Sequence, residues 1–286
     1  MPAAARPESL KYIRELVFGR AAIVLDEHKD YLLDARLIPL ARREGLEGMD
    51  ALVDAMRKPD GTVLQKKVVE AMTTNETSFF RDLHPFDALR TKILPELAVS
   101  RAASRTLRIW CAAASTGQEP YTLAMCVRDL PVFDNWTVQI IATDINTEVL
   151  DRARAGVFKQ LEVNRGLPVA MLVKHFDRVN ADWQVKPHLK QMVQFQELNL
   201  LHRWPLFAQQ DIVFMRNVLI YFDLPTKRGI LQRIREHLRG DGYLALGGAE
   251  TTLNIDPDYV PVRHGASVFY QAKANTETKG ACNAVR

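Results

Sequence analysis

The sequence is poor in cysteine and contains no long apolar run. Its three cysteines, Cys111, Cys126 and Cys282, lie far apart and form neither a CxxC pair nor a Cys/His spacing suited to zinc, so we expect neither disulfides nor a metal site. No window approaches the roughly 18 apolar residues that a membrane-spanning helix needs, and the first residues lack the apolar core of a secretory signal. These absences predict a cytoplasmic protein that does not insert into a membrane.

Neither sign of charge dominates the 286 residues. Lys and Arg number 38 against 34 Asp and Glu, for a formal net charge of +4. Segment 261–286 alone holds four cations and one anion, which leaves the rest of the chain nearly neutral. We therefore expect no nucleic-acid partner, because such a partner requires a broad basic face. The length suits about two globular domains.

Apolar residues recur at helical spacing through residues 8–72, without strand-like alternation. The pattern is interrupted at Gly45, at Gly48 and at the turn 59–61 (Pro-Asp-Gly). Proline fixes φ at such breaks, and glycine tolerates positive φ. We expect a helical domain of three or four helices here.

The periodicity changes after about residue 100. Short apolar runs alternate with helical patterns, which is typical of a parallel α/β sheet with crossover helices. The runs are 107–110, 138–143, 193–198, 211–215, 243–248 and 267–272. The last two belong to one hairpin-like stretch, so we expect an antiparallel strand at the end of an otherwise parallel sheet.

The clearest crossover helix is expected to begin at Pro225 and to end at Gly240 and Gly242, with proline first and glycine last. Its buried stripe comprises Ile230, Leu231, Ile234 and Leu238.

Between Ala155 and Gln191 the alternation of strands and helices stops. A structureless loop of that length is uncommon in a compact domain, so an inserted subdomain fits better. The expected division is a helical domain over 1–90 and a cofactor-binding domain over 91–286, with an insertion at about 155–195. We expect the polar end, Lys273–Arg286, to be frayed.

The passage 108–125 (RIWCAAASTGQEPYTLAM) places small residues just outside the carboxyl end of the first expected strand, where open α/β sheets bind cofactors. It lacks GxGxxG and GxxxxGKS/T, so it offers no usual cradle for a dinucleotide or a nucleoside triphosphate. Asp144 ends the next strand, where an acid can accept both ribose hydroxyls. Small residues also pack helices against strands, and strand-end acids also cap helices. The residues alone leave both explanations open.

Segment 75–82, NETSFFRD, joins the two expected domains. Its spacing sets Asn75, Thr77 and Arg81 within two helical turns of one another, and Arg81 would be able to clamp a carboxylate while the two phenylalanines seal a cleft. The alternative is a pair of core phenylalanines beside a surface arginine that pairs with the next residue.

Segment 214–223, FMRNVLIYFD, places Arg216, Asn217 and Tyr221 at the same edge of the sheet. It lacks the D/N-P-P-Y/F signature of methyltransferases that act on adenine amino groups, which counts against base methylation. A strand-end Arg-Asn pair by itself commonly makes only loop hydrogen bonds.

Five passages together resemble the chemoreceptor glutamate O-methyltransferases of bacterial chemotaxis, the CheR family. They are NETSFFR (75–81), WCAAASTGQEPY (110–121), ATDIN (142–146), ELNL (197–200) and RNVLIYFD (216–223). They stand in the family's order and spacing, and the resemblance extends from about residue 10 to residue 272. It implies an N-terminal helical domain and a Rossmann-like α/β domain that binds S-adenosylmethionine, with a small antiparallel β-subdomain inserted into it.

By position, the resemblance also implies the residues of the site. The cofactor would be lined by Asn75, Thr77, Arg81, Glu119, Asp144, Asn199, Leu200, Arg216 and Asn217. Asp144 would hold the ribose, and Arg81 and Tyr221 would be the catalytic residues nearest the reacting methyl group. No metal is implied. Gln118 departs from the family pattern, in which an acid is expected, whereas Glu119 is kept.

The implied activity is methylation of glutamate γ-carboxyl groups in the cytoplasmic helical bundle of methyl-accepting chemotaxis receptors. A glutamate with a pKa of about 4.3 is ionised at neutral pH, so its attack needs no general base. The seven histidines form no recognisable constellation. Either of two basic clusters, Arg36/Arg42/Arg43 or Lys66/Lys67, would be able to meet acidic receptor sites, although each taken singly is more typical of a solvated surface.

Some members of the family also bind a receptor's C-terminal pentapeptide through a glycine-rich loop of the β-subdomain. The corresponding stretch here, 177–190, has no glycine, so we predict a pentapeptide-independent enzyme. Two alternatives remain. One is a methyltransferase of the same fold acting on a small molecule or nucleic acid, against which the near-neutral charge counts. The other is a non-catalytic S-adenosylmethionine-responsive receptor adaptor, against which Arg81 and Tyr221 count. We expect a monomer, because no long amphipathic stretch is left unassigned.

Overall fold

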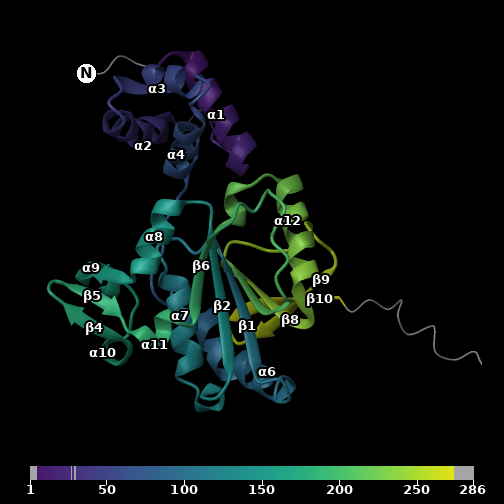
Figure 1. Cartoon of the computed structure of the whole chain (residues 1–286). Helices are drawn as coiled ribbons and strands as arrows, with labels where there is room; N and C mark the ends of the chain where they lie inside the picture. Colours follow the sequence, from purple (N-terminus) through teal and green to yellow (C-terminus); the bar gives the residue numbers. More distant parts are fainter. Residues whose placement is uncertain (1–4, 27, 29, 274–286) are drawn as a thin grey trace, which may run out of the picture.

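A computed structural model describes residues 5–26, 28 and 30–273 of the chain. Cys282 and nearly all of the polar end that we expected to be frayed lie outside this range. The N-terminal part is a bundle of helices standing over one edge of a larger α/β part (Figure 1). Its helices are α1 (Pro7–Ala21), α2 (Asp30–Arg43), α3 (Gly48–Met56) and α4 (Thr62–Met72). The expected helical domain is confirmed.

The bundle has an apolar core of its own. Ile13 and Val17 of α1 pack with Leu37 of α2 and Leu52 of α3, and all four are fully buried. The turn before α4 requires glycine, since a Cβ on Gly61 would lie 2.3 Å from the carbonyl oxygen of Met56. The helices of this bundle and the turn before α4 therefore follow from apolar spacing and turn residues within short segments of the sequence.

The main sheet has seven strands in the order β6-β2-β1-β7-β8-β10-β9. Their bounds are β1 (Thr106–Ala112), β2 (Thr137–Asp144), β6 (Val193–Glu197), β7 (Gln210–Met215), β8 (Leu238–Leu246), β9 (Tyr259–His264) and β10 (Ser267–Ala272). β1 is parallel to β2 and β7, whereas β10 is antiparallel to β8 and β9. The predicted antiparallel strand at the end of the sheet is confirmed.

Strand β9 was not predicted, and the hairpin of this region is β9–β10 rather than β8–β10. Pro261 lies within β9, and most of the strand's side chains are partly or fully exposed. The proline divides the strand's apolar residues, Tyr259, Val260 and Val262, and a proline inside such a run counts against a strand when only the sequence is known. Its position at the sheet edge is the usual place for a strand that contains proline.

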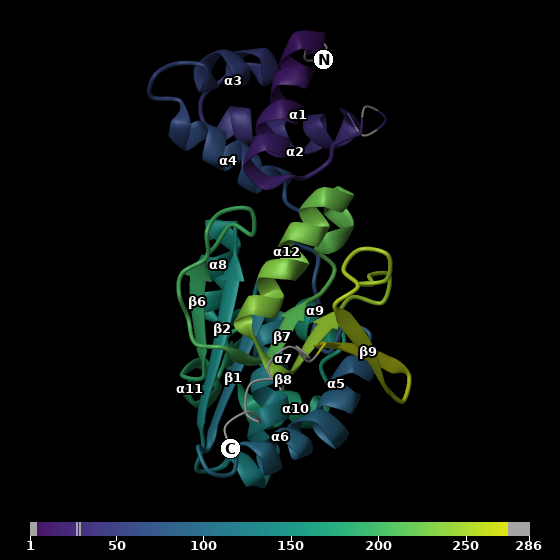
Figure 2. The ribbon, with the colours of Figure 1, turned by 90° about the vertical axis from the view of Figure 1, so that its right-hand side faces the viewer.

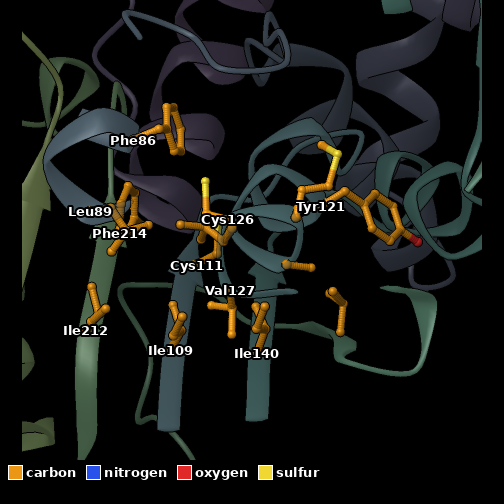
Figure 3. Packing of buried hydrophobic residues seen from close by; sticks show 14 of the residues in the cluster. Phe86, Leu89, Ile109, Cys111, Tyr121, Cys126, Val127, Ile140, Ile212 and Phe214 are labelled. Atoms are coloured by element: carbon orange, nitrogen blue, oxygen red, sulfur yellow. The ribbon is translucent and has the colours of Figure 1, made fainter. Parts of the chain in front are cut away.

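Alternate side chains of the strands pack into two separate cores. Ile109, Ile140 and Ile212 stand side by side on β1, β2 and β7 and face one set of helices (Figure 3). These helices are α5 (His84–Ala88), the π-helical turn η2 (Leu89–Ile93), α6 (Leu94–Ser100) and α7 (Gln118–Arg128). Trp110 and Val213 point to the other face, which α12 (Leu224–His237) covers (Figure 2).

Helix α12 ends earlier than predicted. Its last residue is His237, and Leu238 already has extended backbone and begins β8. Gly240 and Gly242 lie within that strand and do not cap the helix. A Cβ on Gly242 would come within 3.0 Å of the carbonyl oxygens of Arg239 and Asp211, so this glycine serves close strand packing.

The stretch after α8 (Thr147–Ala155) forms the inserted β-subdomain. Its three strands pair antiparallel in the order β3-β5-β4. Its elements are β3 (Val157–Lys159), α9 (Gln160–Asn164), α10 (Val169–His175), β4 (Phe176–Val179), β5 (Asp182–Val185) and α11 (Pro187–Lys190). Among the described residues, no helix is long and apolar enough to cross a membrane.

Candidate functional site

Every residue selected from the sequence lines one cavity at the carboxyl ends of β1, β2 and β7. These residues are Asn75, Thr77, Arg81, Glu119, Asp144, Asn199, Leu200, Arg216, Asn217 and Tyr221. They come from three separate loops, from the last residue of β2 and from the first turn of α7. They meet because the carboxyl ends of parallel strands open at one edge of a sheet.

Asp144, the last residue of β2, is held at the base of the cavity. One carboxylate oxygen accepts the backbone N–H of Ser115 and the other accepts that of Asn146, each over 2.9 Å. Burial raises the pKa of Asp144, while these amide bonds oppose the rise. Each oxygen keeps a lone pair for a further donor, so a pair of vicinal hydroxyls suits this carboxylate.

Backbone strain is concentrated in the loops that form the cavity. In the β1–α7 loop, Ala113 and Ser115 have φ of 61° and 50°, and Gly117 has φ of 97°. The linker and the loop after β7 add Phe80, Asp82, Leu83 and Asn217 at positive φ. Such conformations cost of order 1–3 kcal/mol each for most residues and cluster at functional sites.

Arg216 forms the charged centre of the site. Its side chain is 1% exposed and pairs with Glu119 and Asp82, each over 2.6 Å. It also lies over the ring of Phe86, 5.4 Å from the centroid. The Cys111 thiol donates to Glu119 over 3.3 Å, and burial raises the pKa of that thiol well above its ordinary value. The thiol is therefore neutral and is no nucleophile.

The linker 75–82 does not have the predicted helical spacing. Its backbone has no regular structure up to Ser78 and then turns, with no helix until α5. Asn75 is tied to the α/β part because its carbonyl oxygen accepts the Ser115 hydroxyl over 2.8 Å. Arg81 is oriented by a 2.9 Å hydrogen bond from its guanidinium to the carbonyl oxygen of Glu76.

The sequence left two explanations for Phe79, Phe80 and Arg81: a cleft sealed by the phenylalanines, or core phenylalanines beside a surface arginine. Each was wrong in one part. Both phenylalanines are buried, and Phe79 packs edge-on against Phe158 of the β-subdomain at 5.0 Å, so they do not seal the cavity. The arginine is nevertheless no surface residue paired to its neighbour. It lines the cavity, and Asp82 pairs with Arg216 instead.

Tyr221 stands in a short 3-10 turn, Leu219–Tyr221, between β7 and α12. Its carbonyl oxygen accepts the N–H of Val24 over 3.1 Å. Within the part of the chain that the structure describes, its hydroxyl has no hydrogen-bond partner. It is therefore available to a group that enters the cavity.

Sequence reasoning missed the contribution of the helical bundle. Ala21 and Ile23, at the end of α1, line the cavity. The Asn199 side chain donates to the carbonyl oxygen of Arg20 over 2.7 Å. No motif in the sequence marks these residues. Ser115 was also missed as a site residue, although it lies in a passage of small residues that we singled out.

The two basic clusters are largely engaged within the molecule. Arg36 donates to the carbonyl oxygens of residues 72 and 73 over 2.7 and 2.9 Å. Lys66 pairs with Glu197 and Lys67 with Glu44, each over 2.7 Å. Over the described ranges, Arg42 and Arg43 are the two of these five cations whose side chains make no hydrogen bond or ion pair.

A larger groove of about 900 Å³ adjoins the cavity. It runs between the bundle, α8 and α9, and shares Asn75, Glu76 and Thr77 with the cavity. The groove and the cavity therefore meet at the linker.

A parallel α/β sheet with a cavity over its central strands and a buried carboxylate ending the second strand defines a Rossmann-like cofactor-binding protein. Comparison with known proteins specifies the family. Residues 8–73 match the domain described as "CheR methyltransferase, all-alpha domain", and residues 75–266 match "CheR methyltransferase, SAM binding domain".

Similar proteins cover almost the whole chain. The chain is 41% identical to chemotaxis protein methyltransferase 1 of Pseudomonas aeruginosa and 38% identical to chemotaxis protein methyltransferase Cher2 of Pseudomonas putida, covering 88% of this chain and 93% of each relative. It is 36% identical to chemotaxis protein methyltransferase 1 of Vibrio cholerae, covering 89% and 93%. The chain belongs to the CheR methyltransferase family, and it is an S-adenosylmethionine-dependent methyltransferase of chemotaxis.

The residues present fit this cofactor. S-adenosylmethionine carries a ribose diol and an amino-acid end with both charges. The cavity offers the Asp144 carboxylate for the first, and Glu119 with Arg216 for the second. The Nε of Arg216 is a buried donor without a partner among the described residues. Those residues include no group of three or more His, Cys, Asp or Glu side chains able to hold a metal ion.

Proposed function

We propose that the protein methylates the γ-carboxyl groups of specific glutamates in the cytoplasmic helical bundle of chemotaxis receptors, acting in the cytoplasm as a protein-glutamate O-methyltransferase. The observation that carries this is that Arg81 and Tyr221 line the same cavity, which no histidine lines. A guanidinium and a free phenol suit an acceptor that is already an anion. They do not suit an alcohol or amine, which must first lose a proton.

The chemistry follows from the ionised acceptor. Bound S-adenosylmethionine supplies a methyl group on a sulfonium. Arg81 and Tyr221 would orient the glutamate carboxylate toward that group; transfer would form one bond from a carboxylate oxygen to the methyl carbon and break the carbon–sulfur bond, leaving S-adenosylhomocysteine. The carboxylate is ionised at neutral pH, so no proton moves. Arg81 donates one guanidinium N–H group to the Glu76 carbonyl and keeps its other N–H groups for the acceptor carboxylate.

We assign the remaining roles by position in the cavity. Asp144 receives the ribose hydroxyls, and Glu119 and Arg216 receive the amino-acid end of the cofactor. The other proposed cofactor contacts are Asn75, Thr77, Asn199, Leu200 and Asn217.

Receptor helices would approach along the groove beside the cavity. Arg43 lines this groove and, with Arg42, remains available to acidic receptor residues. Arg36, Lys66 and Lys67 already hold the bundle to the rest of the chain, or to itself, and are not proposed as receptor contacts.

We propose that the enzyme does not require the receptor pentapeptide. Strands β4 and β5 are joined by a two-residue turn, with Asn180 at a φ of 56°. A turn this short leaves no loop to enclose a peptide. Calorimetry with a receptor C-terminal pentapeptide is expected to show no specific binding, and tight, specific binding would contradict the proposal.

The decisive experiment is transfer of labelled methyl groups from S-adenosylmethionine to the purified cytoplasmic fragment of a chemotaxis receptor. Base-labile label on glutamate, lost in Arg81→Ala and reduced in Tyr221→Phe, supports the proposal. Cofactor binding without transfer to any receptor would favour the adaptor. Transfer to nucleic acid or a small molecule would overturn the proposed acceptor.

A further inference from the structure

Glu250 binds the backbone of the loop that carries Tyr221. One carboxylate oxygen accepts the N–H of Asn217 over 2.8 Å and that of Gly247 over 2.7 Å. The other accepts the N–H of Ile220 over 3.2 Å. Glu250 follows β8 and does not line the cavity, so it contacts the site only through this loop.

The loop depends on these bonds because it has little regular structure of its own. It runs from the end of β7 to the start of α12 and contains one short 3-10 turn. Asn217 is held at a φ of 57°, a conformation that asparagine tolerates better than most residues. Amides that point at a carboxylate make stronger hydrogen bonds than neutral pairs do.

The fit between Glu250 and the loop leaves no room for a side chain at position 247. A Cβ on Gly247 would lie 2.7 Å from the side-chain nitrogen of Asn217 and 2.8 Å from the Glu250 carboxylate. The segment after β8 and the loop after β7 are thus in direct contact, with the carboxylate bridging them.

We propose that Glu250 is a positioning residue for methyl transfer. By binding the N–H groups of Asn217 and Ile220, it fixes the backbone of the loop. It thereby determines where the Tyr221 phenol lies in the cavity and where Asn217 lies relative to the cofactor. This inference rests on the proposed role of Tyr221. Displacement of a catalytic group by about 1 Å costs up to roughly 100-fold in rate, so small shifts of this loop matter.

The test compares Glu250→Ala with Glu250→Gln in full-length protein, using methyl transfer to a receptor fragment and titration with S-adenosylhomocysteine. Glu250→Ala is expected to lower kcat about 10- to 100-fold, while the affinity for S-adenosylhomocysteine falls less than about threefold, because most cofactor contacts lie on other loops. Glu250→Gln should recover most of kcat, since its amide oxygen can accept the Asn217 and Gly247 N–H groups.

Thr251→Ala serves as the matched control. Thr251 lies in the same segment and bonds to Leu253 and Tyr270, so kcat should stay near that of the wild type. Unchanged kcat in Glu250→Ala would overturn the inference. A fall in kcat that Glu250→Gln does not recover, accompanied by equal falls in cofactor affinity and melting temperature, would overturn it as well. Tyr221→Phe distinguishes a failure of the proposed function from a failure of this inference. Full activity in Tyr221→Phe contradicts the proposed role of Tyr221. Impaired activity in Tyr221→Phe together with normal activity in Glu250→Ala contradicts only the role of Glu250.

Discussion

Arg216 and Glu119 form a buried ion pair, with a guanidinium nitrogen 2.6 Å from a carboxylate oxygen and side chains that are 1% and 13% exposed. Arg216→Ala would leave the Glu119 carboxylate buried without its partner. We expect it to lower the free energy of unfolding by about 3–5 kcal/mol and to abolish cofactor binding. Urea denaturation and calorimetry measure the two effects.

The control for this variant is an exposed ion pair. Lys11 and Glu15 stand 3.8 Å apart with side chains 74% and 65% exposed, so Lys11→Ala should cost about 0–1 kcal/mol. A loss in Arg216→Ala no larger than in Lys11→Ala would contradict the assigned importance of the buried pair.

Cofactor affinity should fall in acid because of Asp144. Burial raises its pKa above the ordinary value, and only the ionised form can accept two ribose hydroxyls while keeping its two amide bonds. The affinity is therefore full above this raised pKa and is lost as the pH falls through it. Titration with S-adenosylhomocysteine from about pH 8 to about pH 4.5 should show the loss beginning above the usual aspartate range near 3.9.

Asp144→Asn tests the assignment of that pH dependence. The amide is uncharged at every pH, so this variant should bind weakly with no corresponding step. A step of the same size in Asp144→Asn would place its origin in another group.

Glu70 couples the helical bundle to the cofactor site. Its carboxylate accepts the backbone N–H and the hydroxyl of Thr147 over 2.9 and 2.7 Å, at the N-terminus of α8. Asn146, the preceding residue, bonds to Asp144 and to the carbonyl oxygen of Glu70. Glu70→Ala should cost about 1 kcal/mol of stability, because Thr147 loses the acceptor of its N–H and hydroxyl groups, and should weaken S-adenosylhomocysteine binding several-fold.

Calorimetry and thermal melting check this coupling, with two reference variants. Glu70→Gln keeps an acceptor for Thr147 and should recover most of the affinity. Glu47→Ala removes an exposed carboxylate of the same bundle, one that makes no side-chain cap at α3, and should change nothing. Normal affinity in Glu70→Ala would show that the bundle is not coupled to the site through this contact.

Gly166 and Gly229 should respond to alanine in opposite directions. A Cβ on Gly166, at a φ of +93°, would lie 2.1 Å from the carbonyl oxygen of Phe79, whereas one on Gly229 in α12 meets nothing within 4 Å. Gly166→Ala should destabilise the protein by at least roughly 1–3 kcal/mol and slow methyl transfer, because it displaces the linker beside Arg81. Gly229→Ala should stabilise it by about 0.5–1 kcal/mol. Equal melting temperatures would contradict the crowding at Gly166.

The sequence by itself determined the helical bundle, six strands of the main sheet and ten of the residues that line the cavity. Helices and buried strands follow from spacings of two to four residues, which any window of the chain reveals. Residues at the carboxyl ends of β1, β2 and β7 could be grouped without a structure, since parallel strands carry their ends to one edge. The family motifs extended that grouping to Asn75 and Asn199.

The tertiary structure decided which partner each side chain has. Asp82 pairs with Arg216 and not with its neighbour. Phe79 packs against Phe158 of the β-subdomain, and Ile23, which follows α1, lines the cavity. Glu250 binds a loop thirty or more positions away in the chain. Spacing along a chain restricts only near neighbours, whereas these contacts depend on how separate elements pack. For that reason, no local pattern in the sequence predicted these contacts.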